Sequence, residues 1–186
     1  MIQLSERLLA MEESATIAMA KKSRELKSQG MDVISLSLGE PDFHTPDFIK
    51  QAAVEALAQN FTTYTPVPGY DDLRESISRK FLRDNKLNYS KDQIVVSTGA
   101  KQSIANLVLS LINPGDEVII PAPYWVSYLE IVKVAEGIPV VISAGIDKDF
   151  KITGADLEAA ITPKTKMLMF STPCNPTRSE ERRVGK

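Results

Sequence analysis

The second half of the chain alternates short apolar runs with amphipathic stretches, and this alternation constrains the fold more than any other feature. Apolar runs of four or five residues suit buried strands, whereas the longer stretches between them have helical spacing. In chain order the predicted strands and helices cover residues 94–97, 101–112, 117–120, 124–135, 139–143, 154–161 and 166–170. Strands that alternate with helices predict a parallel sheet with helices on both faces. The expected fold is α/β, with a doubly wound and mostly parallel sheet.

The first half of the chain predicts mainly helices. Ser14 is expected to cap a helix over about 15–29, and Thr45 to cap one that ends near residue 59. A further amphipathic helix is expected over about 70–85, and the alternating run 32–38 predicts a strand. The apolar residues before Ser14 predict an N-terminal helical arm that packs on its own or another subunit.

Composition excludes several classes of protein. The 186 residues are 43% hydrophobic and 25% charged, which is ordinary for a globular protein. The net charge of −2 provides no basic field for nucleic acid, and no apolar run reaches membrane-spanning length. Glu6 and Arg7 interrupt the segment where a signal peptide needs an apolar core, so we expect a cytoplasmic protein with small-molecule or protein partners.

Cysteine and histidine are almost absent from the sequence. Cys174 is the only cysteine, so neither an internal disulfide nor a cysteine-based zinc site can form. His44 is the only histidine, which makes a Ser–His or Cys–His catalytic pair a poor expectation. No metal site is predicted.

A small-residue turn, Ser97–Lys101, lies between a predicted strand and a predicted helix. Backbone N–H groups at a helix start favour a phosphate, and the small residues Gly99 and Ala100 would let it approach. The spacing matches neither a P-loop nor a dinucleotide-binding fingerprint. A glycine that only tightens the turn is the alternative interpretation.

Four other residues have both a binding and a structural interpretation. Trp125 follows two prolines at a strand end, where its ring could stack on a planar cofactor or seal the core. Tyr64, in a proline-bearing loop, could donate to a phosphate or be a surface tyrosine. The N–H of Gly39 could meet a substrate carboxylate or serve its turn alone. Asn175 follows a strand, where ligands of parallel sheets bind, but Asn-Pro is also a common turn dipeptide.

Six ordered motifs together give the chain a family resemblance. They are Leu38-Gly-Glu-Pro-Asp-Phe43, Tyr64-Thr-Pro-Val-Pro-Gly69 with Leu73-Arg74, Ser97-Thr-Gly-Ala-Lys101, Asn113-Pro-Gly-Asp-Glu-Val118, Pro123-Tyr-Trp125 and Asn175-Pro-Thr177. The chain resembles the class I aminotransferases over about residues 3–177, and bacterial aspartate aminotransferases that use pyridoxal 5'-phosphate are the nearest likeness.

The resemblance implies a role for each matching residue. The backbone at Gly99, Ala100 and Lys101 would hold the cofactor phosphate, and Tyr64 would reach the phosphate in the other subunit of a homodimer. Trp125 would stack on the pyridine ring and Asn175 would donate to its 3'-oxygen. Together with Gly39, Trp125 and Asn175 would also seat the amino-acid substrate, in an exchange of amino groups between L-aspartate and 2-oxoglutarate.

The resemblance also implies that the catalytic groups lie beyond this sequence. In the family, the lysine that forms the Schiff base, the aspartate at the ring nitrogen and the arginines for substrate carboxylates all follow the Asn-Pro motif. We therefore expect no catalytic residue here and an inactive chain. The expected division is 1–45 for the arm and part of the small domain, 46–177 for an incomplete cofactor-binding large domain, and 178–186 for a charged tail foreign to the family.

Three alternatives stay open on sequence. The chain could be a non-catalytic phosphate-binding or dimerisation fragment, or an aminotransferase for aromatic or other amino acids. Relatives that also transaminate prephenate carry a basic residue near position 12, so Glu12 argues against that broader activity.

Overall fold

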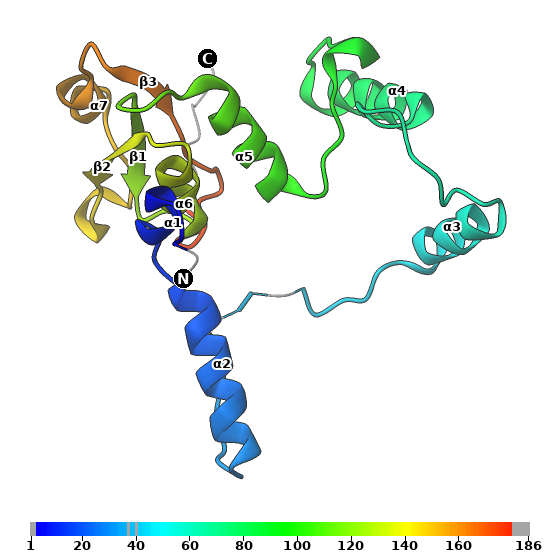
Figure 1. Ribbon diagram of the computed structural model, residues 1–186, viewed down its shortest axis with the longest axis horizontal. Helices are drawn as coiled ribbons and strands as arrows, with labels where there is room; N and C mark the ends of the chain where they lie inside the picture. The colour runs from blue at the N-terminus through cyan, green and yellow to red at the C-terminus, as the bar shows by residue number, and fades with distance from the viewer. Residues whose placement is uncertain (1–2, 37, 40, 180–186) are drawn as a thin grey trace. The chain divides into compact units, whose positions relative to one another are not determined.

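The computed structural model, drawn in Figure 1, describes residues 3–36, 38–39 and 41–179. The contacts within the chain divide it into two compact units. The first unit combines Met1–Leu38 with Ile104–Lys186, and the second is Gly39–Ser103. The predicted domain division at 45 and 177 stays a prediction, and residues 180–186 of the expected tail lie outside the described residues.

A parallel three-stranded sheet forms the centre of the first unit. The strands β1 (Glu117–Ala122), β2 (Ile138–Ser143) and β3 (Thr165–Leu168) lie in the order β2-β1-β3 (Figure 1). Ile119 of β1 pairs with Val140 on one side and with Leu168 on the other. The helix α6 (Ser127–Val134) connects β1 to β2, and α7 (Gly154–Ala160) precedes β3. The predicted α/β class with a mostly parallel sheet is confirmed.

The core of this unit lies between β1 and two helices, α5 (Ala100–Leu111) and α6. Val118 and Ile120 point to the same side of β1 and are fully buried there. The other buried members of this cluster are Val108, Ile112, Tyr128, Val132, Ala135 and Met169. Ile119, on the opposite side of β1, is also fully buried. The central strand is therefore enclosed on both faces, which is what its unbroken apolar sequence predicts.

The predicted N-terminal arm consists of α1 (Glu6–Leu9) and α2 (Ala15–Ser28). After α1, the backbone N–H of Glu12 donates to Oε2 of Glu130 in α6 across 3.0 Å, so the arm docks on its own chain. Ser14 is the N-cap residue of α2, as predicted, although its side chain makes no capping hydrogen bond.

The second unit contains α3 (Asp47–Ala58) and α4 (Asp71–Lys80), and α4 continues as a π-helical turn over Phe81–Asn85. A short 3-10 turn, Lys91–Gln93, leads toward α5. The expected cap at Thr45 is wrong, because Pro46 occupies the N-cap position of α3. By contrast, α7 begins with a complete cap: the Thr153 hydroxyl accepts from the backbone N–H of Asp156 in a capping box.

Two predicted strands, 32–38 and 94–97, are not strands in the described part of the chain. A strand needs a neighbouring ladder to satisfy its backbone, and alternation of side chains alone does not supply one. Ile34 and Leu36 are 86% and 91% exposed, whereas Ile94 is buried and only the N–H of Val96 bonds to another loop. The apolar run 94–97 thus reflects the burial of Ile94 and not the presence of a strand.

Candidate functional site

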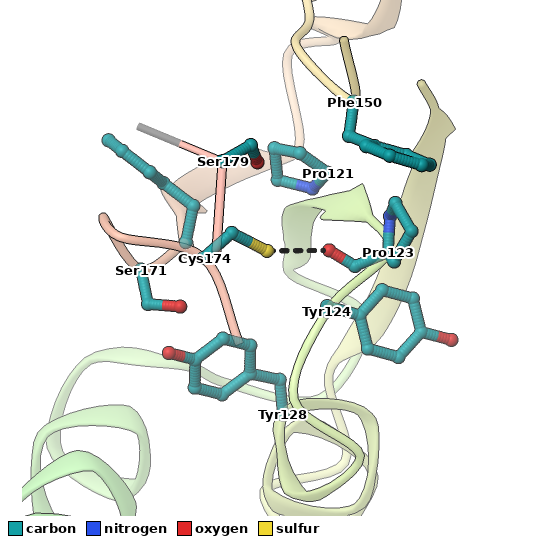
Figure 2. Close-up of a pocket in the computed structure, with 9 residues that line it drawn as sticks. Pro121, Pro123, Tyr124, Tyr128, Phe150, Ser171, Cys174 and Ser179 are labelled. Carbon is teal, nitrogen blue, oxygen red and sulfur yellow. Dashed lines mark hydrogen bonds between the residues drawn. The ribbon is translucent and has the colours of Figure 1, made fainter. Parts of the chain in front are cut away.

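The loops that follow β1 and β3 carry the candidate residues of the first unit. Because these parallel strands are neighbours, their carboxyl ends meet at the same edge of the sheet. The thiol of Cys174 donates to the carbonyl oxygen of Pro123 across 3.2 Å and joins the two loops (Figure 2). Asn175 directly follows Cys174, and Trp125 lies two residues after Pro123, so both are carried to the same edge.

A pocket opens between these loops. Figure 2 shows aromatic rings from three segments around the Cys174–Pro123 bond. The lining residues are Pro121, Pro123, Tyr124, Tyr128, Phe150, Phe170, Ser171, Cys174 and Ser179. Trp125 packs edge-to-face on Tyr128, with the ring centroids 5.5 Å apart, so its indole is supported from α6. The sequence predicted the position of Trp125 but not the pocket beside it.

The loop after β3 is held by its own backbone. The N–H of Asn175 donates to Oγ of Ser171 across 3.3 Å, which fixes the turn that carries the asparagine. The N–H of Cys174 donates to the carbonyl of Ser179, and the N–H of Arg178 donates to the carbonyl of Cys174, at 2.8 and 2.7 Å. Arg178 and Ser179, assigned to a foreign tail on sequence, therefore take part in closing this loop. Asn175 itself is exposed, with its amide available to a ligand.

The turn Ser97–Lys101 lies in the second unit and leads directly into α5, which begins at Ala100. Gly99 adopts φ +87°, a left-handed conformation that favours glycine, and a Cβ there would meet no atom within 4 Å. Its N–H donates to the carbonyl of Ser97 at 2.8 Å, and the N–H of Thr98 donates to the Gln102 side chain. Open space therefore borders the start of a 12-residue helix, whose first N–H groups point along its axis.

This donor set suits a phosphate. The turn offers backbone N–H groups, two hydroxyl-bearing residues and the exposed cation Lys101, and it contains no carboxylate. In the loops of the first unit, the indole of Trp125 and the side-chain amide of Asn175 suit a flat ring that carries an oxygen acceptor. Each unit by itself therefore offers groups for one kind of ligand moiety: a phosphate in the second unit and an aromatic ring in the first.

Tyr64 and Gly39 also lie in the second unit. Tyr64 is fully exposed in the loop before α4, and Gly39 is exposed, with no atom within 4 Å of a Cβ built on it. The structure thus groups Gly39, Tyr64 and the Ser97–Lys101 turn in one unit, and Trp125 with Asn175 in the other. The binding roles of all seven predicted residues stay predictions.

Two residues with contacts at the site received no role from the sequence. Cys174 was considered only for disulfide, metal and catalytic-pair chemistry, although its place directly before the Asn175-Pro-Thr177 motif was a signal. Arg74 was recognised as part of a motif but not as a buried cation, and helical periodicity could not have revealed its burial.

Among the described residues, no helix is both long and apolar enough to cross a membrane.

Comparison with known proteins gives consistent results. The sequence model of aminotransferase class I and II matches residues 31–178. A probable aspartate/prephenate aminotransferase of Rickettsia bellii is 52% identical over 174 residues, which are 94% of this chain and 44% of that protein. The aspartate/prephenate aminotransferase of Nitrosomonas europaea is 51% identical over 178 residues, covering 96% of this chain and 45% of its own length.

A solved structure agrees with these relatives. The aspartate aminotransferase of Thermus thermophilus with maleate superposes with a TM-score of 0.91 at 44% identity, over 95% of this chain and 46% of that one. The present chain therefore spans a little under half the length of the proteins that it matches.

Proposed function

Because the chain belongs to the class I and II aminotransferase family, we propose that it supplies the phosphate-binding and ring-contacting part of an aminotransferase. Enzymes of this family depend on pyridoxal 5'-phosphate, and the donor set described above fits that cofactor. When bound, the cofactor supplies an electron sink that stabilises negative charge on the α-carbon of an amino acid. The observation that carries the proposal is the open turn at Gly99, at the start of α5.

Each residue has a defined task in this proposal. Backbone N–H groups at Gly99, Ala100 and Lys101 donate to the phosphate, that of Gly99 in place of its bond to the Ser97 carbonyl, and the helix dipole adds to their attraction. Trp125 covers one face of the ring, and the Asn175 amide donates to its 3'-oxygen and orients it. Gly39, Trp125 and Asn175 border the amino-acid substrate. Tyr64, with its exposed hydroxyl, reaches the phosphate bound to the other subunit of a homodimer.

We propose L-aspartate as the amino donor and 2-oxoglutarate as the acceptor. Relatives named for aspartate support the donor. Their names also include prephenate, whereas Glu12 predicts against that substrate in this chain. In the structure the Glu12 backbone, and not its carboxylate, makes the recorded contact with Glu130, so the side chain is not committed to that contact. The cytoplasmic location expected from the sequence is part of the same proposal.

Two matched glycines test the phosphate site. Gly99 and Gly115 have φ +87° and +86°, and a Cβ at either would meet nothing within 4 Å. Alanine at either position is therefore strained by about 1 kcal/mol or more, but only Gly99 lies at the proposed site. We expect Gly99→Ala to weaken pyridoxal 5'-phosphate binding about tenfold or more in a spectroscopic titration, while Gly115→Ala retains it. Equal binding by both variants, or none by the unmodified chain, would refute the proposal.

A further inference from the structure

Among the described residues, Arg74 is the one charged side chain that is buried, with only 7% of its surface exposed. Burying a guanidinium is costly unless its N–H groups and its charge are satisfied. Arg74 lies in the first half of α4, immediately after the loop that carries Tyr64. Its contacts therefore show what this buried cation holds together.

The guanidinium bonds to two carbonyl oxygens from separate segments. Nε donates to Gly69 across 3.2 Å, and Nη1 donates to Lys91 across 3.0 Å. Gly69 ends the Tyr64 loop, whereas Lys91 begins the segment that leads to the Ser97–Lys101 turn. The rigid fork of arginine can meet both acceptors at once, which a lysine ammonium cannot do with the same geometry.

Carboxylates balance the buried charge. Nη2 of Arg74 donates to Asp71, and Oδ1 of Asp92 lies 3.7 Å from Nη1. Asp71 also accepts from Nζ of Lys91 at 2.8 Å. The hydrogen bond from Lys91, followed by that from Arg74, lowers the pKa of Asp71 and keeps this carboxylate charged at neutral pH.

The same two segments meet at a second point. The N–H of Val96 donates to the carbonyl of Pro68 across 3.0 Å. A Cβ at Gly69 would lie 2.8 Å from Cγ2 of Val96, so only glycine permits this approach, and its φ of +98° also favours glycine. The end of the Tyr64 loop is therefore packed directly against the segment before the phosphate turn.

Tyr64 depends on these anchors because its own ring is fully exposed. The loop is fixed at its ends by the edge-to-face contact of Phe61 with Tyr70, at 5.6 Å between centroids, and by the contacts at Pro68 and Gly69. Loss of an anchor would leave the hydroxyl with a wider range of positions.

We propose that Arg74 is a positioning residue that fixes the Tyr64–Gly69 loop to the Lys91–Ser97 segment. Its guanidinium then holds two proposed phosphate contacts, Tyr64 and the Ser97–Lys101 turn, in one arrangement within the second unit. The identity of the ligand rests on the proposed function, but the clamp does not. In the proposed dimer, Tyr64 serves the partner's phosphate and the turn serves its own, so one guanidinium links the two cofactor sites.

Amide hydrogen exchange of the 186-residue chain, without cofactor, tests the clamp. In Arg74→Met, the amides of Gly69 and Val96 should exchange roughly ten- to a hundredfold faster, as expected for the loss of hydrogen bonds to a charged group. The amide of Ser78, inside α4, should change by less than about twofold, which separates local release from general destabilisation. Arg79→Met is the matched control: Arg79 lies in the same helix, 69% of its side chain is exposed, and no effect on either loop amide is expected.

Arg74→Lys provides a second, better tolerated variant. It keeps the charge but cannot serve both carbonyls, so it should restore the slow exchange of Gly69 and Val96 only in part. Unchanged exchange in Arg74→Met, equal acceleration at Ser78, or full restoration by lysine would each overturn the proposal. A chain that fails to bind pyridoxal 5'-phosphate would refute the proposed function and leave this exchange result standing.

Discussion

The sulfur of Cys174 and the carbonyl oxygen of Pro123 lie 3.2 Å apart and form a hydrogen bond between the loops after β3 and β1. These loops carry Asn175 and Trp125. A single thiol therefore helps to set the distance between a ring-stacking residue and a ring-donating residue. Because a thiol is a weak donor, this bond fixes the relative position of the two loops more than it stabilises the fold.

Removal of the thiol should loosen the loop after β3. In Cys174→Ala, we expect the amides of Asn175 and Arg178 to exchange several-fold faster, because a neutral hydrogen bond contributes about 1 kcal/mol. Cys174→Ser keeps a donor and should remain close to the unmodified chain. Equal exchange in all three proteins would show that the bonds made by the N–H groups of Cys174, Asn175 and Arg178 hold the loop without the thiol.

The titration of Asp71 should show its ion-pair partners. Its pKa in the folded chain should lie below the ordinary 3.8, first because of the hydrogen bond from Lys91 and then because of that from Arg74. Since the folded pKa is depressed, the stabilisation is complete above the unfolded pKa and is lost as the pH falls through the lower folded value.

Carboxyl carbon NMR would measure this directly. Lys91→Met should raise the Asp71 midpoint more than Arg74→Met does, and Arg79→Met should leave it in place. The exposed carboxylate limits the effect on overall stability, because solvent screens the pair. A midpoint of 3.8 or higher in the folded chain would contradict the ion-pair geometry.

Helix α7 should depend on its capping box. Thr153→Ala removes the acceptor for the Asp156 N–H and should destabilise the helix by about 1 kcal/mol. Thr153→Ser keeps the hydroxyl and should retain most of that stability. Exchange of the Asp156 amide is the appropriate measurement, and identical rates in the two variants would mean that the hydroxyl contributes nothing.

The isolated chain should self-associate. Both β2 and β3 lie at the edges of the described sheet, and Ile34 and Leu36 are almost fully exposed. Open edges and apolar surface favour association between chains. Light scattering after size exclusion should detect species larger than 20.5 kDa, and the double variant Ile34→Ser, Leu36→Ser should reduce them. A soluble monomer with a cooperative thermal transition would contradict this expectation.

Much of the α/β core could be predicted because local signals and burial agree there. Val118–Ile120 form an apolar run without polar interruption, and that run became the fully buried centre of β1. The Thr153 cap was equally predictable, because its partner lies three residues away. The strands predicted at 32–38 and 94–97 are not seen in the described residues. This outcome could not be predicted locally, because a strand depends on distant ladder partners.

The site shows the same division between local and distant information. The Ser97–Lys101 turn could be predicted, since small residues just before a helix favour a turn of the backbone. The buried state of Arg74 could not, because its acceptors at Gly69 and Lys91 come from turns whose meeting in space no periodicity encodes. The Cys174 contact with Pro123 spans 51 residues and was hidden for the same reason.

The strand order β2-β1-β3 also sets an order of assembly during translation. The β1–β2 pair becomes available as soon as the ribosome has released residue 143, whereas β3 joins the other side of β1 only about one more helix later. The loop that bears Asn175 is thus the last described part to reach its neighbour. A nascent chain paused before that point would already have its hydrophobic centre but would still lack the junction between the two ring-contacting loops.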